Sequence, residues 1–288
     1  MKKDTKHARA DIINKSLSYI YKYIHTNITL DELAKLNSVS KYHFHRIFKE
    51  ETGENLFERI ISIRLQKAAN LLISNCYSTI SEIREQSGYS SHSSFVKAFK
   101  SRFGFTPTQW KKGGYMEYSK KNISFNIHIN DDFLSIIPII KVAPKRVCAY
   151  IRHKGYDLSV TNTWERLMAF SYEKKFDSAI QIGVFHDNPV ITPYEDCHYI
   201  AAFEVENTFI STNSISKLEI DESLCAIFHY EGVYGDVTKL MVYIYNFWLP
   251  NSEYEAQTLP AYAIYHKNHF LEENDRFNLD FYVPIQIV

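Results

Sequence analysis

Residues 81–110 read SEIREQSGYSSHSSFVKAFKSRFGFTPTQW, and this stretch decides the fold of the N-terminal part of the chain. Thr79 and Glu82 have the spacing of a capping box, in which each side chain accepts a hydrogen bond from the other residue's backbone N–H. Gly88 marks a turn, Ser91 can cap a second helix, and Gly104 can end it. The pattern therefore predicts two short helices joined by a tight turn, which is a helix-turn-helix.

The same pattern occurs about fifty residues earlier, after an amphipathic helix predicted over residues 8–25. Thr29 and Glu32 repeat the capping box, and Ser40 takes the place of Ser91. Four further residues, Phe44, Phe48, Lys49 and Gly53, recur fifty-one positions later as Phe95, Phe99, Lys100 and Gly104. A helix predicted over residues 56–74 joins the two units. Its length of roughly 28 Å, with the turns added, approaches the roughly 34 Å of one turn of B-DNA.

The second helix of each unit has one polar face that is suited to reading DNA. The outward positions are Tyr42, His45, Arg46 and Lys49 on the first helix, and Ser93, Val96, Lys97 and Lys100 on the second. Arginine pairs with guanine edges, while serine hydroxyls and a valine methyl surface meet other base edges and thymine methyl groups. Lys41 and Arg102 are expected to join the lysines in contacting phosphates.

The zero net charge of the chain hides a strong division between its halves. Residues 1–121 contain 21 Lys and Arg against 11 Asp and Glu, whereas residues 122–288 contain 12 against 22. The first segment therefore carries +10 and the second −10, which indicates that only the first binds a polyanion.

The N-terminal segment resembles the AraC/XylS family of transcription regulators over residues 8–112. The resemblance rests on Gly88-Tyr89, Ser94-Phe95, Phe99-Lys100, Thr106-Pro107 and Trp110. It implies that Tyr42, His45 and Arg46 read bases in the first unit, and that Ser93, Ser94 and Lys97 do so in the second. The chain departs from the family pattern in its first unit, at Ser38, where a glycine is usual, and at Leu56 and Arg59.

The second half predicts an α+β domain of two βαββ repeats related by a pseudo-twofold axis, with a cleft between them. Residues 146–155, RVCAYIRHKG, are echoed by residues 223–232, SLCAIFHYEG, and residues 200–205 are echoed by residues 278–283. We therefore expect a helical domain over 1–112, a glycine- and lysine-containing linker over 113–122, and the α+β domain over 123–288.

This second half resembles the GyrI-like small-molecule-binding domains, through motifs such as VAPKRVCAYIRHKG, FWLPNSEYE and LPAYAIY. The resemblance implies an aromatic pocket for amphipathic, often cationic compounds. The candidate pocket residues are Trp164, Phe185, Tyr245, Trp248, Ala263 and Tyr265. Each of these aromatic residues can equally be an ordinary core residue. Ala263 stands where the family often has a glutamate, which argues against a preference for cations, and Glu253 cannot be placed from sequence.

Other chemistries find little support in the sequence. No phosphate-binding glycine loop, dinucleotide fingerprint or nucleophile elbow occurs. His43 and His45 lie two positions apart on a helix and face apart, so we expect no metal site there and no cofactor. His186-Asp187 is expected in a solvated loop. The four cysteines are not in C-x-x-C spacing and indicate a reducing compartment, and no apolar run reaches membrane-spanning length.

Taken together, the sequence predicts a cytoplasmic, non-enzymatic regulator that binds double-stranded DNA and a small-molecule effector, with RNA polymerase as a further partner. Two alternatives stay open at this point. The C-terminal domain could hydrolyse a small molecule, as some GyrI-like proteins do. The chain could instead bind DNA constitutively, with a C-terminal domain that senses nothing.

Overall fold

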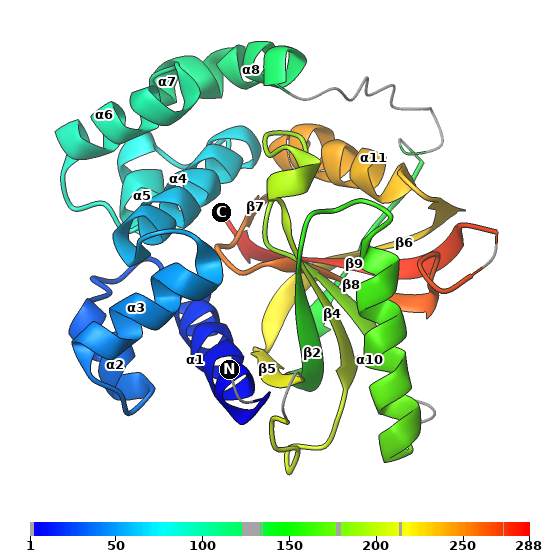
Figure 1. Ribbon diagram of the computed structural model, residues 1–288. Coiled ribbons are helices and arrows are strands. Elements are labelled where there is room, and N and C mark those ends of the chain that lie inside the picture. The colour runs from blue at the N-terminus through cyan, green and yellow to red at the C-terminus, as the bar shows by residue number, and fades with distance from the viewer. Residues whose placement is uncertain (1–2, 123–132, 134, 177–179, 213–214, 273) are drawn as a thin grey trace.

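A computed structural model describes residues 3–122, 133, 135–176, 180–212, 215–272 and 274–288. It contains a helical part followed by a large antiparallel sheet with helices on one face (Figure 1). The predicted two-domain architecture is confirmed. The boundary expected at residue 123 falls among residues 123–132, which lie outside the described ones. No helix in the described ranges has the length and apolar character needed to span a membrane.

The helical part contains the two helix-turn-helix units. Its elements are α1 (Lys3–Lys22), α2 (Leu30–Leu36), α3 (Lys41–Thr52), α4 (Leu56–Ser74), α5 (Ile80–Gln86), α6 (His92–Phe103), α7 (Pro107–Gln109), the π-helical turn η1 (Trp110–Gly114) and α8 (Tyr115–Asn122). Both predicted capping boxes are present, at Thr29 and at Thr79. Gly53 and Gly104 end α3 and α6 in left-handed conformations, as predicted. The expected linker is helical, because residues 115–122 form α8.

Glycine is required at the second turn for steric reasons. Gly88 has a φ of 81°, and a Cβ added there would lie 2.4 Å from the carbonyl oxygen of Ile24 and 2.8 Å from Nε of Arg64. In the first turn Ser38 adopts a φ of 54°, so a serine occupies the left-handed conformation that usually favours glycine. The close approach at Gly88 lets Arg64 donate to the carbonyl of Ile24, which ties α4 to the segment after α1.

The sheet runs through the whole second part of the chain. Its strands are β1 (Ile139–Ala143), β2 (Arg146–Lys154), β3 (Gln181–Phe185), β4 (His198–Glu204), β5 (Ser216–Ile220), β6 (Ser223–Val233), β7 (Tyr254–Ala256), β8 (Ala261–Lys267) and β9 (Arg276–Ile287). The helical segments in this part of the chain are α10 (Val160–Lys174), η2 (Tyr194–Asp196), α11 (Asp236–Tyr243), η3 (Ile244–Trp248) and η4 (Leu249–Asn251). The strand order is β1-β6-β9-β8-β3-β4-β2-β5, with β7 paired to β9.

Strict alternation along the strands gives the sheet two different faces. Ala263 and Tyr265 of β8 belong to the core beneath α10 and α11, whereas Tyr262 and Ile264 belong to a second apolar cluster on the opposite face. We call these the helix-covered face and the open face. Helix α1 lies against part of the open face, near β5.

The two helix-turn-helix units have different cores. The first unit has its own cluster, formed by α1, α2, α3 and the first half of α4. The second unit shares one continuous cluster with the helix-covered face of the sheet. Trp110 is fully buried there and donates through Nε1 to the carbonyl oxygen of Ala69. The second unit is therefore joined to the sheet by apolar packing.

Substitution of the two left-handed glycines by alanine separates backbone strain from steric clash. Gly53→Ala meets no atom within 4 Å, so we expect only the conformational cost of about 1 kcal/mol. Gly88→Ala adds the clash with Ile24 and Arg64, which we expect to cost about 1–3 kcal/mol more. Urea unfolding followed by circular dichroism measures both. Equal losses in the two variants would contradict the packing described here.

Candidate DNA interface, effector cleft and the contact between them

The polar face predicted on α3 is exposed in the structure. Tyr42 has 80% of its surface exposed, and Lys41, His45, Arg46 and Lys49 are also exposed. The opposite face is buried and consists of Phe44, Ile47 and Phe48. The Arg46 guanidinium lies 3.3 Å from Nδ1 of His43 and 3.9 Å from Glu50, so it is held along the helix surface while facing solvent.

The corresponding face of α6 is more lightly charged. Ser93, Ser94, Lys97 and Lys100 are exposed, and Val96 is half-buried. Phe95, Phe99 and Phe103 form the buried side. The N-cap Ser91 accepts from the N–H of Ser94 and lies 3.0 Å from the hydroxyl of Ser93, so the start of the helix is well ordered.

Helices α3 and α6 both lie in the part of the helical region that is away from the sheet (Figure 1). Helices α1 and α4 stand between them and the second domain, since α1 contacts β5 and α4 contacts β7, η3 and η4. The exposed residues named on α3 and α6 are therefore not used in the docking of the two domains, whereas Arg102 near the end of α6 lines a pocket shared with Lys154 and Asp196 of the second domain.

Three of the predicted pocket residues meet on the helix-covered face. Trp164 of α10 donates through Nε1 to the hydroxyl of Tyr199, 3.2 Å away, and this hydroxyl lies 3.3 Å from that of Tyr265. The Phe185 ring packs on Tyr199 at 5.3 Å and on Tyr156 at 5.4 Å. Burial raises the pKa of Tyr156, Tyr199 and Tyr265, so all three are neutral donors near pH 7. All of these side chains are buried, and we call the group, which the sequence analysis assigned to a cleft, the cleft cluster.

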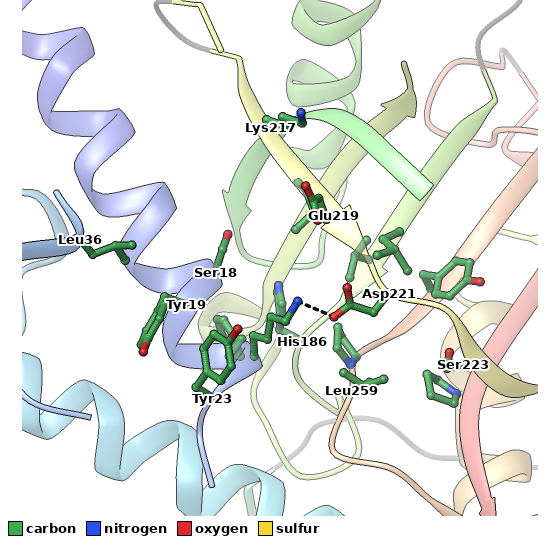
Figure 2. Close-up of a pocket in the computed structure, with 18 residues that line it drawn as sticks. Ser18, Tyr19, Tyr23, Leu36, His186, Lys217, Glu219, Asp221, Ser223 and Leu259 are labelled. Carbon is green, nitrogen blue, oxygen red and sulfur yellow. Dashed lines mark ion pairs between the residues drawn. The ribbon is translucent and has the colours of Figure 1, made fainter. Parts of the chain in front are cut away.

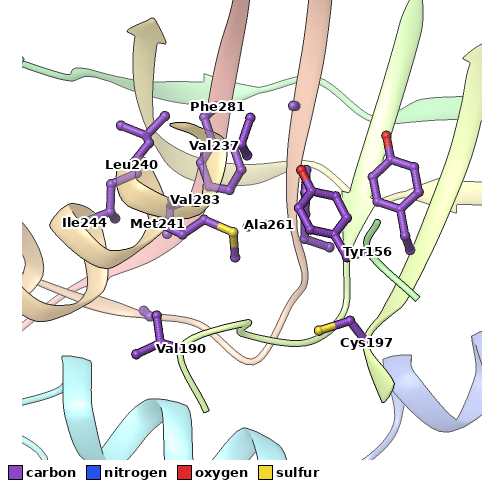
Figure 3. Packing of buried hydrophobic residues seen from close by; sticks show 14 of the residues in the cluster. Tyr156, Val190, Cys197, Val237, Leu240, Met241, Ile244, Ala261, Phe281 and Val283 are labelled. Carbon is purple, nitrogen blue, oxygen red and sulfur yellow. The ribbon is translucent and has the colours of Figure 1, made fainter. Parts of the chain in front are cut away.

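Small residues make room for the cleft cluster. Gly183 of β3 pairs with Ala263 of β8, and a Cβ on Gly183 would lie 2.3 Å from the Tyr199 hydroxyl and 2.9 Å from the Tyr265 ring. Ala263 is fully buried beside it. Figure 3 shows the adjoining part of the core, where Tyr156 stands close to Ala261 and residues of α11 approach β9.

The other two predicted pocket aromatics lie apart from the cleft cluster. Tyr245 lines a cavity of about 50 Å³ together with Phe185, and α4 closes it with Lys67 and Asn70. Trp248 packs edge-on against Phe228 and stacks on Tyr254. The structure therefore brings Trp164, Phe185 and Tyr265 together, places Tyr245 at the edge of Phe185, and puts Trp248 in a different part of the core.

Polar contacts at the end of α4 fix the two domains to each other. The Asn75 side chain donates to the carbonyl oxygen of Ala256 and accepts from its N–H, both at 3.0 Å. The Glu255 carboxylate is buried and accepts from the backbone N–H of Ser78 at 2.6 Å and from its hydroxyl. Asn75 thus pairs with β7 as a neighbouring strand would, and the buried carboxylate is satisfied by the second helix-turn-helix unit.

Lys67 of α4 also points into this contact. Its amine donates to the carbonyl oxygen of Thr258 and lies 3.5 Å from that of Tyr21. Burial lowers the pKa of the amine from 10.5 to about 7. The interface therefore contains a lysine that is partly neutral at physiological pH.

Several residues of this contact were missed or misplaced by sequence reasoning. His186 was expected in a solvated loop, and this expectation was wrong. Its ring stacks on that of Tyr21 in α1, with the two centroids 3.9 Å apart. Asp187 accepts from the N–H and from Nδ1 of His198, both at 2.8 Å. Glu253 is exposed, and the buried acid of this segment is Glu255. Periodicity in the sequence could not have predicted these contacts, because the partners of His186 and Glu255 are distant in the chain.

A second unpredicted group has the composition of a metal site. His229, His266 and Asp280 come from β6, β8 and β9, and one possible ligand atom from each lies within 4.8 Å of the others. Both imidazoles contact the Asp280 carboxylate, at 2.9 and 3.0 Å. Two histidines and one carboxylate can hold a divalent transition metal. The residues are 14 to 51 positions apart, so spacing alone could not have indicated the cluster.

These features define a chain with a double helix-turn-helix followed by a ligand-binding α+β domain. Residues 137–286 match the GyrI-like small molecule binding domain, and residues 33–113 match a helix-turn-helix domain of the AraC type. The chain belongs to the GyrI-like family and carries an AraC-type helix-turn-helix region in front of that domain. Both resemblances noted in the sequence are confirmed.

Known relatives with similar sequences include regulators. The chain is 32% identical over 108 residues to the "Probable transcription factor PqrA" of Proteus vulgaris, covering 37% of this chain and 88% of that protein. It is 28% identical over 100 residues to the "Msm operon regulatory protein" of Streptococcus mutans serotype c, covering 35% of this chain and 36% of that protein. The chain thus covers most of PqrA, but it spans only about a third of the length of the Msm operon regulatory protein.

Among solved structures, the chain is similar to the C-terminal domain of AraT, a response regulator from Geobacillus stearothermophilus. The identity is 32% and the TM-score 0.34, over 35% of this chain and 84% of that chain.

Because burial lowers the pKa of Lys67, the free energy of unfolding should depend on pH. Substitution of Lys67 should remove this dependence. Between pH 7 and 10.5 the unfolded chain keeps the proton that the folded chain has lost, so unfolding becomes harder as pH rises. Lys67→Met should flatten this rise, because methionine has no proton to lose. Melting temperatures across pH 7–10 test it, with Lys97→Met on the exposed face of α6 as the control. Parallel pH profiles for wild type and Lys67→Met would rule out the low pKa.

Proposed function

We propose that the chain is a sequence-specific DNA-binding transcription regulator controlled by a small amphipathic molecule. The observation that carries the proposal is the pair of capped, outward-facing helices α3 and α6, joined in one chain to a small-molecule-binding domain. Two relatives, described as a probable transcription factor and an operon regulatory protein, support it.

The predicted contact residues of the two helices divide into two groups in this proposal. Arg46 and Lys97 contact bases, with Tyr42, His45, Ser93, Ser94 and Val96 beside them on the same faces. Lys49, Lys100, Lys41 and Arg102 contact phosphates and set the register on the duplex. We infer that the protein works in the cytoplasm, where it meets chromosomal DNA and RNA polymerase.

We place the DNA-binding domain at residues 1–112, the connection at 113–122 and the effector domain at 123–288. Within the effector domain, β2-α10-β3-β4 and β6-α11-β8-β9 have the same order of elements and occupy mirrored positions in the sheet. This order supports two βαββ repeats about a pseudo-twofold axis, with the cleft cluster between them. The effector contacts Trp164, Phe185 and Tyr265 over a floor that includes Ala263. Tyr245 and Trp248 lie further from the effector than these residues do.

The effector acts by shifting populations between domain arrangements that differ in affinity for DNA. Helix α4 is the element that transmits this shift. Its second half packs into the core that contains the cleft cluster, and its first half packs beneath α3. A ligand that moves the packing around Phe185 therefore also changes the support of the recognition helices.

Substitution of Arg46 tests the DNA interface. A target duplex is first selected from a random library with the wild-type protein. Arg46→Ala should then weaken its binding by about 1–3 kcal/mol, or about 5- to 150-fold, with a change in base preference. Lys49→Ala should remove one phosphate contact. The slope of log affinity against log salt concentration should then fall by about one, and the base preference should not change. Fluorescence anisotropy measures both, and Arg166→Ala, exposed on α10, is the matched control. Unchanged affinity in Arg46→Ala would exclude this interface.

Substitution of Ala263 tests the chemistry of the effector cleft. With alanine there, the wild type should bind the neutral probe triphenylphosphine oxide at least as tightly as the cation tetraphenylphosphonium. Ala263→Glu places a carboxylate at the cleft and should reverse that order by tenfold or more, because a buried charge favours an opposite one. Ala263→Gln controls for size. Calorimetric titration measures the affinities. If neither probe binds the wild type, the protein binds DNA without sensing such compounds.

A further inference from the structure

A cavity of about 450 Å³ lies between the DNA-binding domain and the open face of the sheet. It is separate from the cleft cluster, because Val184 and Tyr262, which line it, point to the opposite face from Phe185 and Tyr265. Figure 2 shows Ser18 and Tyr19 of α1 and Tyr23, which directly follows α1, on one side and Glu219, Asp221 and Leu259 on the other. Its volume is within the usual range for sites that take drug-sized molecules.

The walls of this cavity are largely apolar and aromatic. Helix α1 supplies Tyr19, the turn after it supplies Tyr23, and Leu36 of α2 also lines the cavity. The sheet domain supplies Val184 and Tyr262, which are almost fully buried, together with other aliphatic residues of β5 and of the segment before β8. Flat aromatic molecules fit between tyrosine rings and aliphatic side chains of this kind. The Lys22 amine and the Asp221 carboxylate pair across the cavity at 2.7 Å, so they fasten one wall to the other.

One part of the wall has polar groups that lack partners. Both ring nitrogens of His186 are buried, and neither has a hydrogen-bond partner among the described residues. Arg152 does not line the cavity itself, but all three of its guanidinium nitrogens are also buried without a partner among the described residues. Its guanidinium lies over the ring of the lining residue Tyr21, 5.9 Å from the centroid. Buried donors without acceptors are rare in folded proteins and call for an explanation.

The electrostatic environment of this part of the wall favours an anion. Burial lowers the pKa of His186 well below its ordinary value, and the nearby positive charges of Arg152, Lys67 and Arg59 lower it further. The two carboxylates that line the cavity are already paired, Asp221 with Lys22 and Glu219 with Lys145, and Asp187 next to His186 is engaged with His198. An acceptor with negative charge would satisfy the unpaired donors and the excess positive charge together.

We propose that this interdomain cavity is a second ligand site, and that it binds an aromatic carboxylate. The ring system lies between the α1 tyrosines and Val184, and the carboxylate accepts a hydrogen bond from His186 in the field of Arg152. Because its walls come from both domains, the ligand stabilises the docked arrangement and is linked to any change that separates α1 from the sheet. The site does not depend on DNA binding.

The test uses the full-length chain and 2-naphthoate, followed by calorimetric titration, with 2-naphthylmethylammonium as the matched cation. We expect one naphthoate per chain and at least tenfold weaker binding of the cation. His186→Phe retains the stacking on Tyr21 but removes the donor, and it should weaken naphthoate binding tenfold or more. Tyr23→Ala, at a partly exposed position, should weaken it several-fold without disturbing the fold. Tyr172→Ala, exposed on α10, should leave it unchanged.

Triphenylphosphine oxide then identifies the face that is occupied. Naphthoate should still bind at one per chain when triphenylphosphine oxide is saturating, because the cleft cluster is on the other face of the sheet. Three results would overturn the proposal: wild-type affinity in both His186→Phe and Tyr23→Ala, preference for the ammonium probe, or no naphthoate binding up to millimolar concentration. Competition between the two probes would place naphthoate in the cleft and would also count against the cavity.

Discussion

The second helix-turn-helix unit and the sheet bury their apolar side chains in one shared core, and the arrangement of the whole molecule depends on this sharing. Separating the two would expose Leu71, which lines a small cavity together with Phe185, as well as parts of the sheet, at a free-energy cost proportional to the apolar area. Asn75 and Glu255 add direction to this packing, because their hydrogen bonds are satisfied in one register only. The second unit and the sheet are therefore expected to behave as one body.

The first unit is attached in a different way. Its apolar residues are buried in a core of its own, and it meets the sheet mainly through α1, by the Tyr21–His186 stack, the Lys22–Asp221 pair and a hydrogen bond from Asn14 to Ser216. These are polar and aromatic contacts around a cavity, and exchanging them for water costs less than opening a core. A change in the spacing of α3 and α6 would therefore arise most easily by movement of the first unit.

Local sequence signals predicted the local structure well. The capping boxes at Thr29 and Thr79 and the glycine ends at Gly53 and Gly104 were readable because each involves residues within one helical turn. The exposed face of α3 followed from helical periodicity. The candidate cleft was recovered only in part: Trp164, Phe185 and Tyr265 meet, whereas Trp248 packs on Phe228. Aromatic composition indicates that a residue is buried but not which neighbours it has, since packing partners come from strands distant in the chain.

The sequence by itself determined the two helix-turn-helix units, the polarity of their faces, the change to an α+β domain and the family of each part. These properties are encoded in periodicity, caps and motifs of a few residues, whose energetics are local. Only the tertiary structure decided where α4 docks, that Glu255 is satisfied by Ser78, and that His186 lies buried against Tyr21 beside an interdomain cavity. Such contacts join positions more than a hundred residues apart. They depend on how the surfaces of two folded domains fit together, and no local sequence pattern predicts that.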